Sequence, residues 1–235
     1  VARIVKEIHP GVPIIFGGLS SSYFHEELIG YPQVDFVLRG DSTEPPLHQL
    51  LVALRDGAPL DRIPNLTWKD AGQVRVNPHT FVPTTLDYVD IRPELVVEMM
   101  VRDRDFVSAL PFNGWWRNPI AAVFTVKGCA YECVTCGSSR TTCTHLTKRQ
   151  RPVFRSPASL VANVEAFARL TRGPIALIGD LRQAGPDHTS EVLERLRAAN
   201  LRNEIMFELF SAPPPEYLRE IDRCVPHWSI EFSPE

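Results

Sequence analysis

The first third of the chain alternates short apolar runs with segments of helical spacing. The apolar runs are rich in β-branched residues and are bounded by glycine or proline, which is typical of buried strands. Strands that alternate with helices predict a parallel α/β sheet. We therefore expect a truncated Rossmann-like (flavodoxin-like) sheet in residues 1–56. The elements that this pattern predicts are helices at residues 2–9, 24–29 and 45–55 and strands at residues 12–16 and 34–38.

The same alternation returns in the last half of the chain with four predicted strands. A β-strand followed by a helix at this regular period is typical of a parallel β/α barrel. Residues 119–235 are therefore expected to form part of a TIM-like (β/α) barrel. The elements that the pattern predicts here are strands at residues 120–126, 174–178, 204–210 and 227–232 and helices at residues 156–170, 189–199 and 213–224.

A connector without regular alternation separates these two parts. We expect residues 57–118 to be a linker, in which the alternating residues around Asp70-Ala71-Gly72 predict a β-hairpin. Residues 94–112 give no clear pattern. The polar and basic segment at residues 138–151 is expected to be an exposed loop.

Composition limits the class of protein. Of the 235 residues, 44% are hydrophobic and 23% are charged, as in ordinary globular proteins, and the net charge of −3 gives no indication of a nucleic-acid partner. The absence of a long apolar run or a signal-peptide pattern predicts a cytoplasmic protein without a membrane partner. The chain begins with Val1 inside a predicted helix and ends directly after a predicted strand, so we expect a fragment cut at both ends.

Candidate chemistry centres on three cysteines that follow the apolar run at residues 120–126. Cys129, Cys133 and Cys136 have C-x3-C-x2-C spacing and lie after the carboxyl end of a predicted strand, where parallel folds place their sites. Structural zinc takes four ligands, and iron–sulfur clusters are usually held by four cysteines. Three local cysteines therefore suggest an iron–sulfur cluster with one open iron.

Two other uses of the cysteines are weighed. The loop also fits a zinc site, with Cys143 or His145 as the fourth ligand. A disulfide framework is disfavoured, because the five cysteines are few and odd in number and three of them lie in one short loop. We expect Cys143 and Cys224 to be ordinary small buried residues.

The cysteine loop, with the preceding Thr125 and Gly128, resembles the signature of the radical S-adenosylmethionine (SAM) enzymes. The resemblance implies that the three cysteines bind a [4Fe–4S] cluster whose fourth iron is chelated by SAM. One electron then cleaves SAM to methionine and a 5′-deoxyadenosyl radical. It also implies an external electron donor, such as flavodoxin or ferredoxin. The family usually has an aromatic residue just before the third cysteine, and this chain has Thr135 there.

The same resemblance implies further SAM-binding residues. The family's Gly-Gly-Glu segment after the second barrel strand corresponds here to Gly179 and Asp180, with one glycine absent and Asp in place of Glu. Glu231 and Ser233 loosely match polar residues at the end of the family's fourth strand. Glu208 and Glu231 are also candidates because a buried carboxylate is costly unless it is paired. Strand alternation leaves open whether either carboxylate faces the barrel interior or a helix outside it.

Residues 1–56 resemble the C-terminal half of the cobalamin-binding domain that precedes many radical SAM domains. In that domain a Gly-Gly pair after a strand lies against the nucleotide tail, which implies that Gly17, Gly18 and Ser20 border cobalamin. Gly40-Asp41 then corresponds to the pair that closes the following strand. By itself, Gly17-Gly18 is a weak signal and favours a tight turn without a ligand. The family's cobalt-ligating histidine would lie upstream of Val1.

The leading hypothesis is thus a radical SAM enzyme with a cobalamin-binding domain and a small-molecule or peptide substrate. Methyl transfer to an unactivated carbon is the commoner reaction of that subclass. One alternative is a zinc-stabilised, non-enzymatic α/β protein. The other is a radical SAM enzyme that does not bind cobalamin. In the resembling family the barrel has six units, so roughly a third of it would be missing here.

Overall fold

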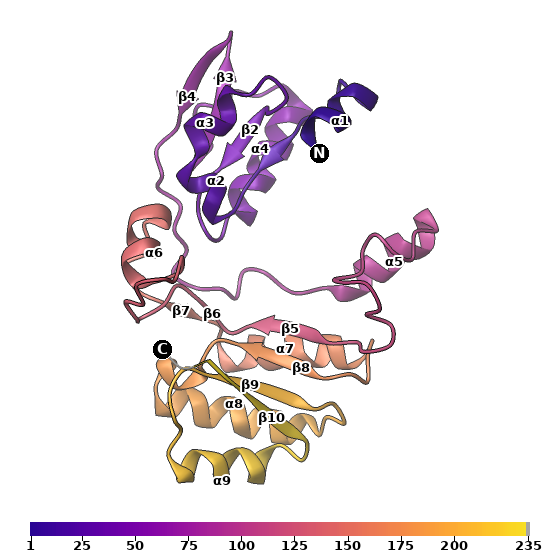
Figure 1. The fold of residues 1–235 in the computed structure, drawn as a ribbon, viewed down its shortest axis with the longest axis vertical. Helices are drawn as coiled ribbons and strands as arrows, with labels where there is room; N and C mark the ends of the chain where they lie inside the picture. The colour runs from indigo at the N-terminus through magenta and orange to yellow at the C-terminus, as the bar shows by residue number, and fades with distance from the viewer. Residues whose placement is uncertain (234–235) are drawn as a thin grey trace. The chain divides into compact units, whose positions relative to one another are not determined.

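The computed structural model describes residues 1–233 of the chain, which Figure 1 colours from end to end. These residues fall into two compact units. The first unit comprises Val1–Thr84 and Gly128–Pro152, and the second comprises Thr85–Lys127 and Val153–Glu235. Among the described residues, no helix combines the length and the apolar character needed to cross a membrane.

The first unit contains a four-stranded sheet of mixed direction. Strand β1 (Ile15–Phe16) pairs in parallel with β2 (Phe36–Leu38). Strands β3 (Leu66–Asp70) and β4 (Gln73–Val76) form the expected hairpin, and β3 pairs antiparallel to β2. The predicted hairpin is therefore confirmed, and it extends the parallel pair as part of the same sheet.

Helices pack around this sheet, and most of them follow the predicted pattern. Helix α4 contains prolines in its first turn and ends at Gly57 in the left-handed conformation, as helix start and stop signals require. Its Leu50 and Ala53 pack with Leu38, Ile63 and Leu66 in a small core. The helices of the first unit are α1 (Ala2–Ile8), α2 (Leu19–Tyr23), α3 (His25–Gly30), α4 (Glu44–Asp56) and α6 (Arg140–Thr147).

The expectation of an exposed loop at residues 138–151 is wrong for its central part, which is helix α6. Ser139 is the N-cap of this helix, and its side chain accepts a hydrogen bond from the Thr142 amide. Such capping satisfies an amide that the helix leaves unpaired. Cys143 and Thr147 are buried on one face of α6, so a polar sequence with only a few inward positions still forms a packed helix.

The second unit contains a four-stranded parallel sheet with the order β10-β9-β8-β5. All neighbouring strands are parallel, and helical segments lie between successive strands along the chain, as in a β/α barrel that is not closed. The expected α/β class with a partial barrel is confirmed. The strands are β5 (Ala121–Phe124), β8 (Ile175–Ile178), β9 (Ile205–Leu209) and β10 (Trp228–Phe232), and the helices that follow include α7 (Pro157–Ala168), η1 (Leu181–Ala184), α8 (Pro186–Ala199) and α9 (Pro215–Cys224).

Helices α7, α8 and α9 cover one face of this sheet (Figure 1). Val123, Leu177 and Phe207 point toward the helices and are buried. Because side chains alternate along a strand, the neighbouring residues Phe124 and Glu208 belong to the opposite face. Phe124 remains 50% exposed. This opposite side, which we call the open face, corresponds to the interior side of the partial barrel.

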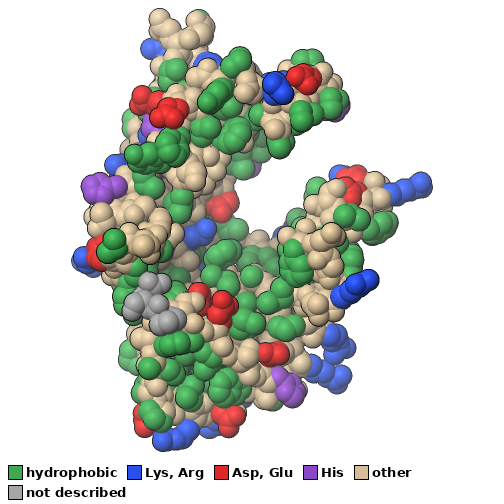
Figure 2. Space-filling view, in the orientation of Figure 1, with side chains coloured by type: hydrophobic (Ala, Val, Ile, Leu, Met, Phe, Trp, Pro, Cys, Tyr) green, Lys and Arg blue, Asp and Glu red, His purple; other side chains and the backbone are tan. Residues whose placement is uncertain are grey.

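Two smaller elements complete the second unit. Strands β6 (Val126–Lys127) and β7 (Val153–Phe154) form a short antiparallel pair. Helix α5 (Pro93–Asp103) occupies the region for which the sequence gives no clear pattern, and Met100 is its buried residue. The other large hydrophobic side chains of α5 are exposed (Figure 2), namely Leu95, Val96, Val97, Met99 and Val101.

The hydroxyl of Tyr217 allows a direct test of this packing. The side chain is only 7% exposed, and its hydroxyl has no hydrogen-bond partner among the described residues. Burial, together with the nearby charge of Asp180, raises the pKa of Tyr217 above its usual value. We expect Tyr217→Phe to raise the free energy of unfolding by about 1 kcal/mol, because an unsatisfied buried hydroxyl is costly. Urea unfolding measures the change.

The exposed Tyr23 provides the control, because Tyr23→Phe removes a hydroxyl that solvent already satisfies. The stability of the control is expected to stay unchanged. A loss of stability in Tyr217→Phe would contradict the prediction and would indicate that the Tyr217 hydroxyl has a partner.

Candidate functional site

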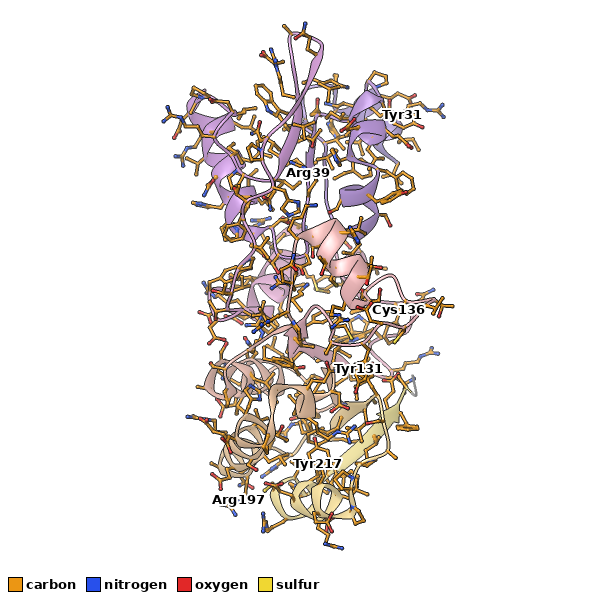
Figure 3. The ribbon with its side chains drawn as sticks, turned by 90° about the vertical axis from the view of Figure 1, so that its left-hand side faces the viewer. Tyr31, Arg39, Tyr131, Cys136, Arg197 and Tyr217 are labelled. Carbon is orange, nitrogen blue, oxygen red and sulfur yellow. The ribbon has the colours of Figure 1, made fainter. Side chains whose placement is uncertain are left out.

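The three cysteines lie on one loop, which follows β5 and β6 and ends at the start of α6. Two successive turns shape its second half, since the Cys136 amide donates to the Cys133 carbonyl and the Ser139 amide donates to the Cys136 carbonyl, both at 3.2 Å. The Arg140 amide also donates to the Tyr131 carbonyl at 2.8 Å. Tyr131 and Cys136 are labelled on this loop in Figure 3. The loop is therefore compact, and hydrogen bonds between its own backbone groups hold its conformation.

Backbone amides donate to two of the cysteine sulfurs. The Tyr131 amide lies 3.4 Å from Cys129 Sγ, and the Ser138 amide lies 3.4 Å from Cys136 Sγ. Hydrogen bonds to cysteine sulfurs are among the features that tune iron–sulfur clusters. A donor set of three thiols with amide support therefore fits such a cluster. Within residues 1–233, however, no three or more His, Cys, Asp or Glu side chains are grouped closely enough to hold a metal ion.

Cys143 lies on α6 as a buried residue that is 5% exposed, and its thiol donates to the Ser138 carbonyl. Burial and the nearby charge of Asp41 raise the pKa of Cys143 above its ordinary value. His145 lies exposed on the same helix. The prediction that Cys143 and Cys224 are small buried residues is confirmed.

Gly179 follows β8 at the carboxyl end of the second sheet, where space for a side chain is lacking. Its φ is +103°, and a Cβ placed there would lie 2.4 Å from Val126 Cγ1 and 2.9 Å from Thr125 Oγ1. The Gly179 amide donates to Glu208 Oε2 at 2.6 Å. Thr125 Oγ1 donates to the Ile178 carbonyl at 2.9 Å. These contacts fix the peptide of Gly179 against the strand that precedes the cysteine loop.

Asp180 is 2% exposed, and its carboxylate is bonded within the protein. Arg182 donates to it from Nε at 2.9 Å and from Nη2 at 2.6 Å. The backbone amides of Arg182 and Phe210 donate to it as well. The side chain therefore fixes the turn after β8 and joins it to the end of β9. Whether Asp180 also orients SAM stays a prediction.

Glu208 and Glu231 are neighbours on the open face. They are register partners on the adjacent parallel strands β9 and β10, and the residues flanking Glu208 are buried on the helix side. Both carboxylates therefore lie on the open face of the sheet and not on the face that the helices cover. Two adjacent like charges are unfavourable without a cation, a proton or hydrogen bonds, and Glu208 has the Gly179 amide. Ser233 follows β10, and its amide donates to the Leu209 carbonyl.

In the first unit, the predicted cofactor residues lie at the carboxyl end of β1. Gly17, Gly18 and Ser20 are exposed, and a Cβ on Gly18 would have no atom within 4 Å. The turn is joined to the end of β2, since Ser22 Oγ donates to the Gly18 carbonyl and accepts from the Gly40 amide, each at 2.8 Å. The turn that contains Gly18 and the turn that contains Gly40 therefore lie together at the carboxyl ends of β1 and β2. We call this edge of the first sheet the glycine edge.

His79 is a feature of this edge that sequence reasoning missed. Its Nε2 is buried and has no hydrogen-bond partner among the described residues, and a Cβ on Gly40 would lie 3.6 Å from it. Burial, reinforced by the positive charges of Arg39 and Lys148, lowers the pKa of His79 to about 4. His79 lies in a proline-rich stretch without periodicity, so no sequence signal places it beside Gly40.

Comparison with known proteins adds two kinds of relative. No protein-family model matches the chain. An uncharacterized methyltransferase of Pyrococcus horikoshii is 29% identical over 140 residues, which is 59% of this chain and 28% of that relative. The chain therefore spans less than a third of the relative's length.

Two solved radical SAM enzymes share the fold. The methyltransferase TsrM from Kitasatospora setae, with tryptophan and a SAM analogue bound, gives a TM-score of 0.69 at 17% identity over 98% of this chain and 43% of its own. The cobalamin-dependent SAM radical enzyme OxsB, with aqua-cobalamin and SAM bound, gives 0.63 at 17% identity over 98% and 32%. At 17% identity, this structural similarity establishes the fold alone. The chain spans less than half the length of either enzyme.

Gly179 provides a test of the crowded turn after β8. We expect Gly179→Ala to lower the free energy of unfolding by about 1–3 kcal/mol, because it adds both backbone strain and a clash with Val126. Chemical denaturation measures the loss. Gly137→Ala is the matched control, since a Cβ there meets no atom within 4 Å. Equal stability of the two variants would contradict the prediction.

His79 predicts a pH dependence of stability. Because its folded-state pKa of about 4 lies below the ordinary 6.5, the unfolded chain binds more protons between these values. The free energy of unfolding should therefore fall as the pH drops from 6.5 toward 4. Urea unfolding at pH 7 and pH 5 measures the effect, and His79→Asn should reduce the difference. The exposed His48→Asn is the control, and an identical pH dependence in both variants would refute the assignment.

Proposed function

We propose that the chain is part of a radical SAM enzyme that holds an iron–sulfur cluster on Cys129, Cys133 and Cys136. The observation that carries the proposal is the loop itself. Three cysteines follow a parallel strand at its carboxyl end, and amides donate to two of their sulfurs. The fold that the chain shares with TsrM and OxsB supports the same conclusion.

The proposed role of the loop is to supply three thiolates and to leave one position of the cluster open. When bound, a [4Fe–4S] cluster supplies the electron for reductive cleavage of SAM. The Tyr131 and Ser138 amides, which donate to Cys129 and Cys136, would remain as hydrogen-bond donors to the cluster's sulfur ligands. An external flavodoxin or ferredoxin is the proposed electron donor.

The proposed SAM-binding residues are those at the carboxyl ends of β8, β9 and β10. Glu208 holds the amide of Gly179, so the peptide after β8 has a fixed orientation. The carboxylates of Glu208 and Glu231 suit the positive charges on the sulfonium and the amino group of SAM. Asp180 and Ser233 complete the set, with Asp180 acting through the turn that its carboxylate stabilises.

We further propose that the first unit binds cobalamin along its glycine edge. Gly17, Gly18 and Ser20 are exposed there, and the glycines let a ligand approach the backbone closely. TsrM has also been solved with cobalamin and a [4Fe–4S] cluster bound. Methyl transfer to an unactivated carbon of a small molecule or peptide is the proposed reaction, in keeping with the methyltransferase relative.

Metal and sulfide analysis tests the proposal. We expect anaerobically prepared protein to contain about four irons and four sulfides per chain and to give a reduced-state EPR signal that SAM shifts. Cys136→Ala should lose the cluster, because each of the three thiolates is needed. Cys224→Ala is the control, since Cys224 is buried in the core of the second unit, and it should keep the cluster.

The zinc alternative predicts a different result from the same samples. One zinc per chain, no sulfide and no response to SAM would refute the radical SAM assignment. Loss of that zinc in Cys143→Ala would then identify Cys143 as the fourth ligand. Retention of the iron–sulfur cluster in Cys143→Ala is the result expected if Cys143 packs as a small buried residue whose thiol donates to the Ser138 carbonyl.

A further inference from the structure

Arg149 is a buried cation at the end of the cysteine segment. Its side chain is 2% exposed and forms a two-pronged ion pair with Asp41, with Nε at 2.6 Å from Oδ2 and Nη2 at 2.9 Å from Oδ1. Its Nη1 also donates to the Pro83 carbonyl at 3.0 Å. The planar guanidinium suits such paired bonds, which a lysine cannot form. Arg149 therefore joins the end of β2 to the segment after the hairpin.

The same side chain packs against the first residue of the cysteine loop. A Cβ on Gly128, whose φ is +82°, would lie 2.6 Å from Arg149 Cδ. The absence of a side chain at Gly128 thus makes room for the stem of Arg149 directly before Cys129. One arginine consequently contacts both the beginning of the loop and the strand end that carries Asp41.

The other end of the cysteine segment is fixed through α6. The Arg149 amide donates to the Cys143 carbonyl, and Thr144 Oγ1 donates to the Arg149 carbonyl, both at 3.3 Å. Helix α6 also packs against α2, the helix that follows the Gly17-Gly18 turn. The segment from Gly128 to Arg149 is therefore closed on itself and attached to the first sheet.

We infer that Arg149 is a positioning residue that clamps the cysteine loop to the carboxyl edge of the first sheet through Asp41. Removing one partner of a buried ion pair leaves the other charge uncompensated, so the clamp is sensitive to either residue. The inference deepens the proposed function, because the clamped loop is the proposed cluster site. The clamp makes the conformation of the cluster loop depend on the sheet that carries the glycine edge.

Alkylation of buried cysteines tests the clamp without any cluster. Cys143 is buried beneath the loop on α6, whereas Cys224 is buried in the core of the second unit. In the cluster-free chain, Arg149→Lys, which keeps the positive charge, should speed alkylation of Cys143 by N-ethylmaleimide about tenfold, while Cys224 keeps its wild-type rate. Asp41→Asn should also speed it, and there part of the rise comes from removing the negative charge near the thiol. Peptide mass spectrometry measures both rates at one pH.

Further variants sharpen the result. Arg149→Gln, Asp41→Asn and their double variant form a cycle, and the double variant removes both charges, so its effect should be smaller than the sum of the effects of Asp41→Asn and Arg149→Gln. Glu191→Gln is the matched control, because Glu191 forms an exposed ion pair with Arg195 on α8. The control should leave both cysteine rates unchanged.

Unchanged Cys143 rates in Asp41→Asn and Arg149→Lys would overturn the clamp. An equal rise of the alkylation rates of Cys143 and Cys224 in both variants would also overturn the clamp, since the ion pair would then support only the global stability of the chain. If Asp41→Asn unfolds the chain and Arg149→Lys does not, the Cys143 alkylation rate of Arg149→Lys decides whether the clamp exists, because this variant keeps the positive charge.

Iron and sulfide content separates this inference from the proposed function. In the reconstituted protein, Arg149→Lys should lose iron to a chelator about tenfold faster than the wild type. A wild type that binds no cluster refutes the proposed function, and the alkylation rates then still decide the clamp. A wild type that binds the cluster, together with unchanged chelation and alkylation rates in the variants, refutes the clamp alone.

Discussion

One-sided burial of the parallel sheet in the second unit decides which of its side chains are available for chemistry. Helices α7, α8 and α9 cover the face that carries Val123, Leu177 and Phe207. Strand alternation then assigns Glu208 and Glu231 to the open face. The bond from the Gly179 amide to Glu208 follows from this geometry, because the turn after β8 lies beside β9 at the same sheet edge. The packing of the core thereby creates the candidate SAM site.

Much of this arrangement is predictable from the sequence, because it depends on local periodicity. The four barrel strands and the helices α7, α8 and α9 are predicted by the periodicity of apolar residues, and proline at the first turn indicates the start of α7 and α9. Helix α8 begins at Pro186, three residues before its predicted start at Thr189. The cysteine spacing likewise identifies its loop without any structure. Strand β1 is an instructive exception, since it comprises Ile15 and Phe16 alone of the run predicted at residues 12–16.

Interactions between distant residues are beyond such reasoning. The ion pair between Arg149 and Asp41 joins positions 108 residues apart, and nothing in either local sequence specifies it. Asp41 fits the family's Gly-Asp pair, but the structure shows its carboxylate engaged by an arginine. Helix α6 was missed for a related reason. Its polar residues lack a strong apolar face, and its stability depends on the Ser139 cap and on burial of Cys143.

The buried arginine also explains why the loop needs glycine before its first cysteine. A cluster loop must present several thiolates while satisfying its own backbone, and a short loop has few side chains for that purpose. Gly128 leaves space for the aliphatic part of the Arg149 side chain, and the guanidinium donates hydrogen bonds to Asp41 and to the Pro83 carbonyl. Structural support of the segment is thus carried by Arg149 and Gly128, which are different residues from the three proposed ligands Cys129, Cys133 and Cys136.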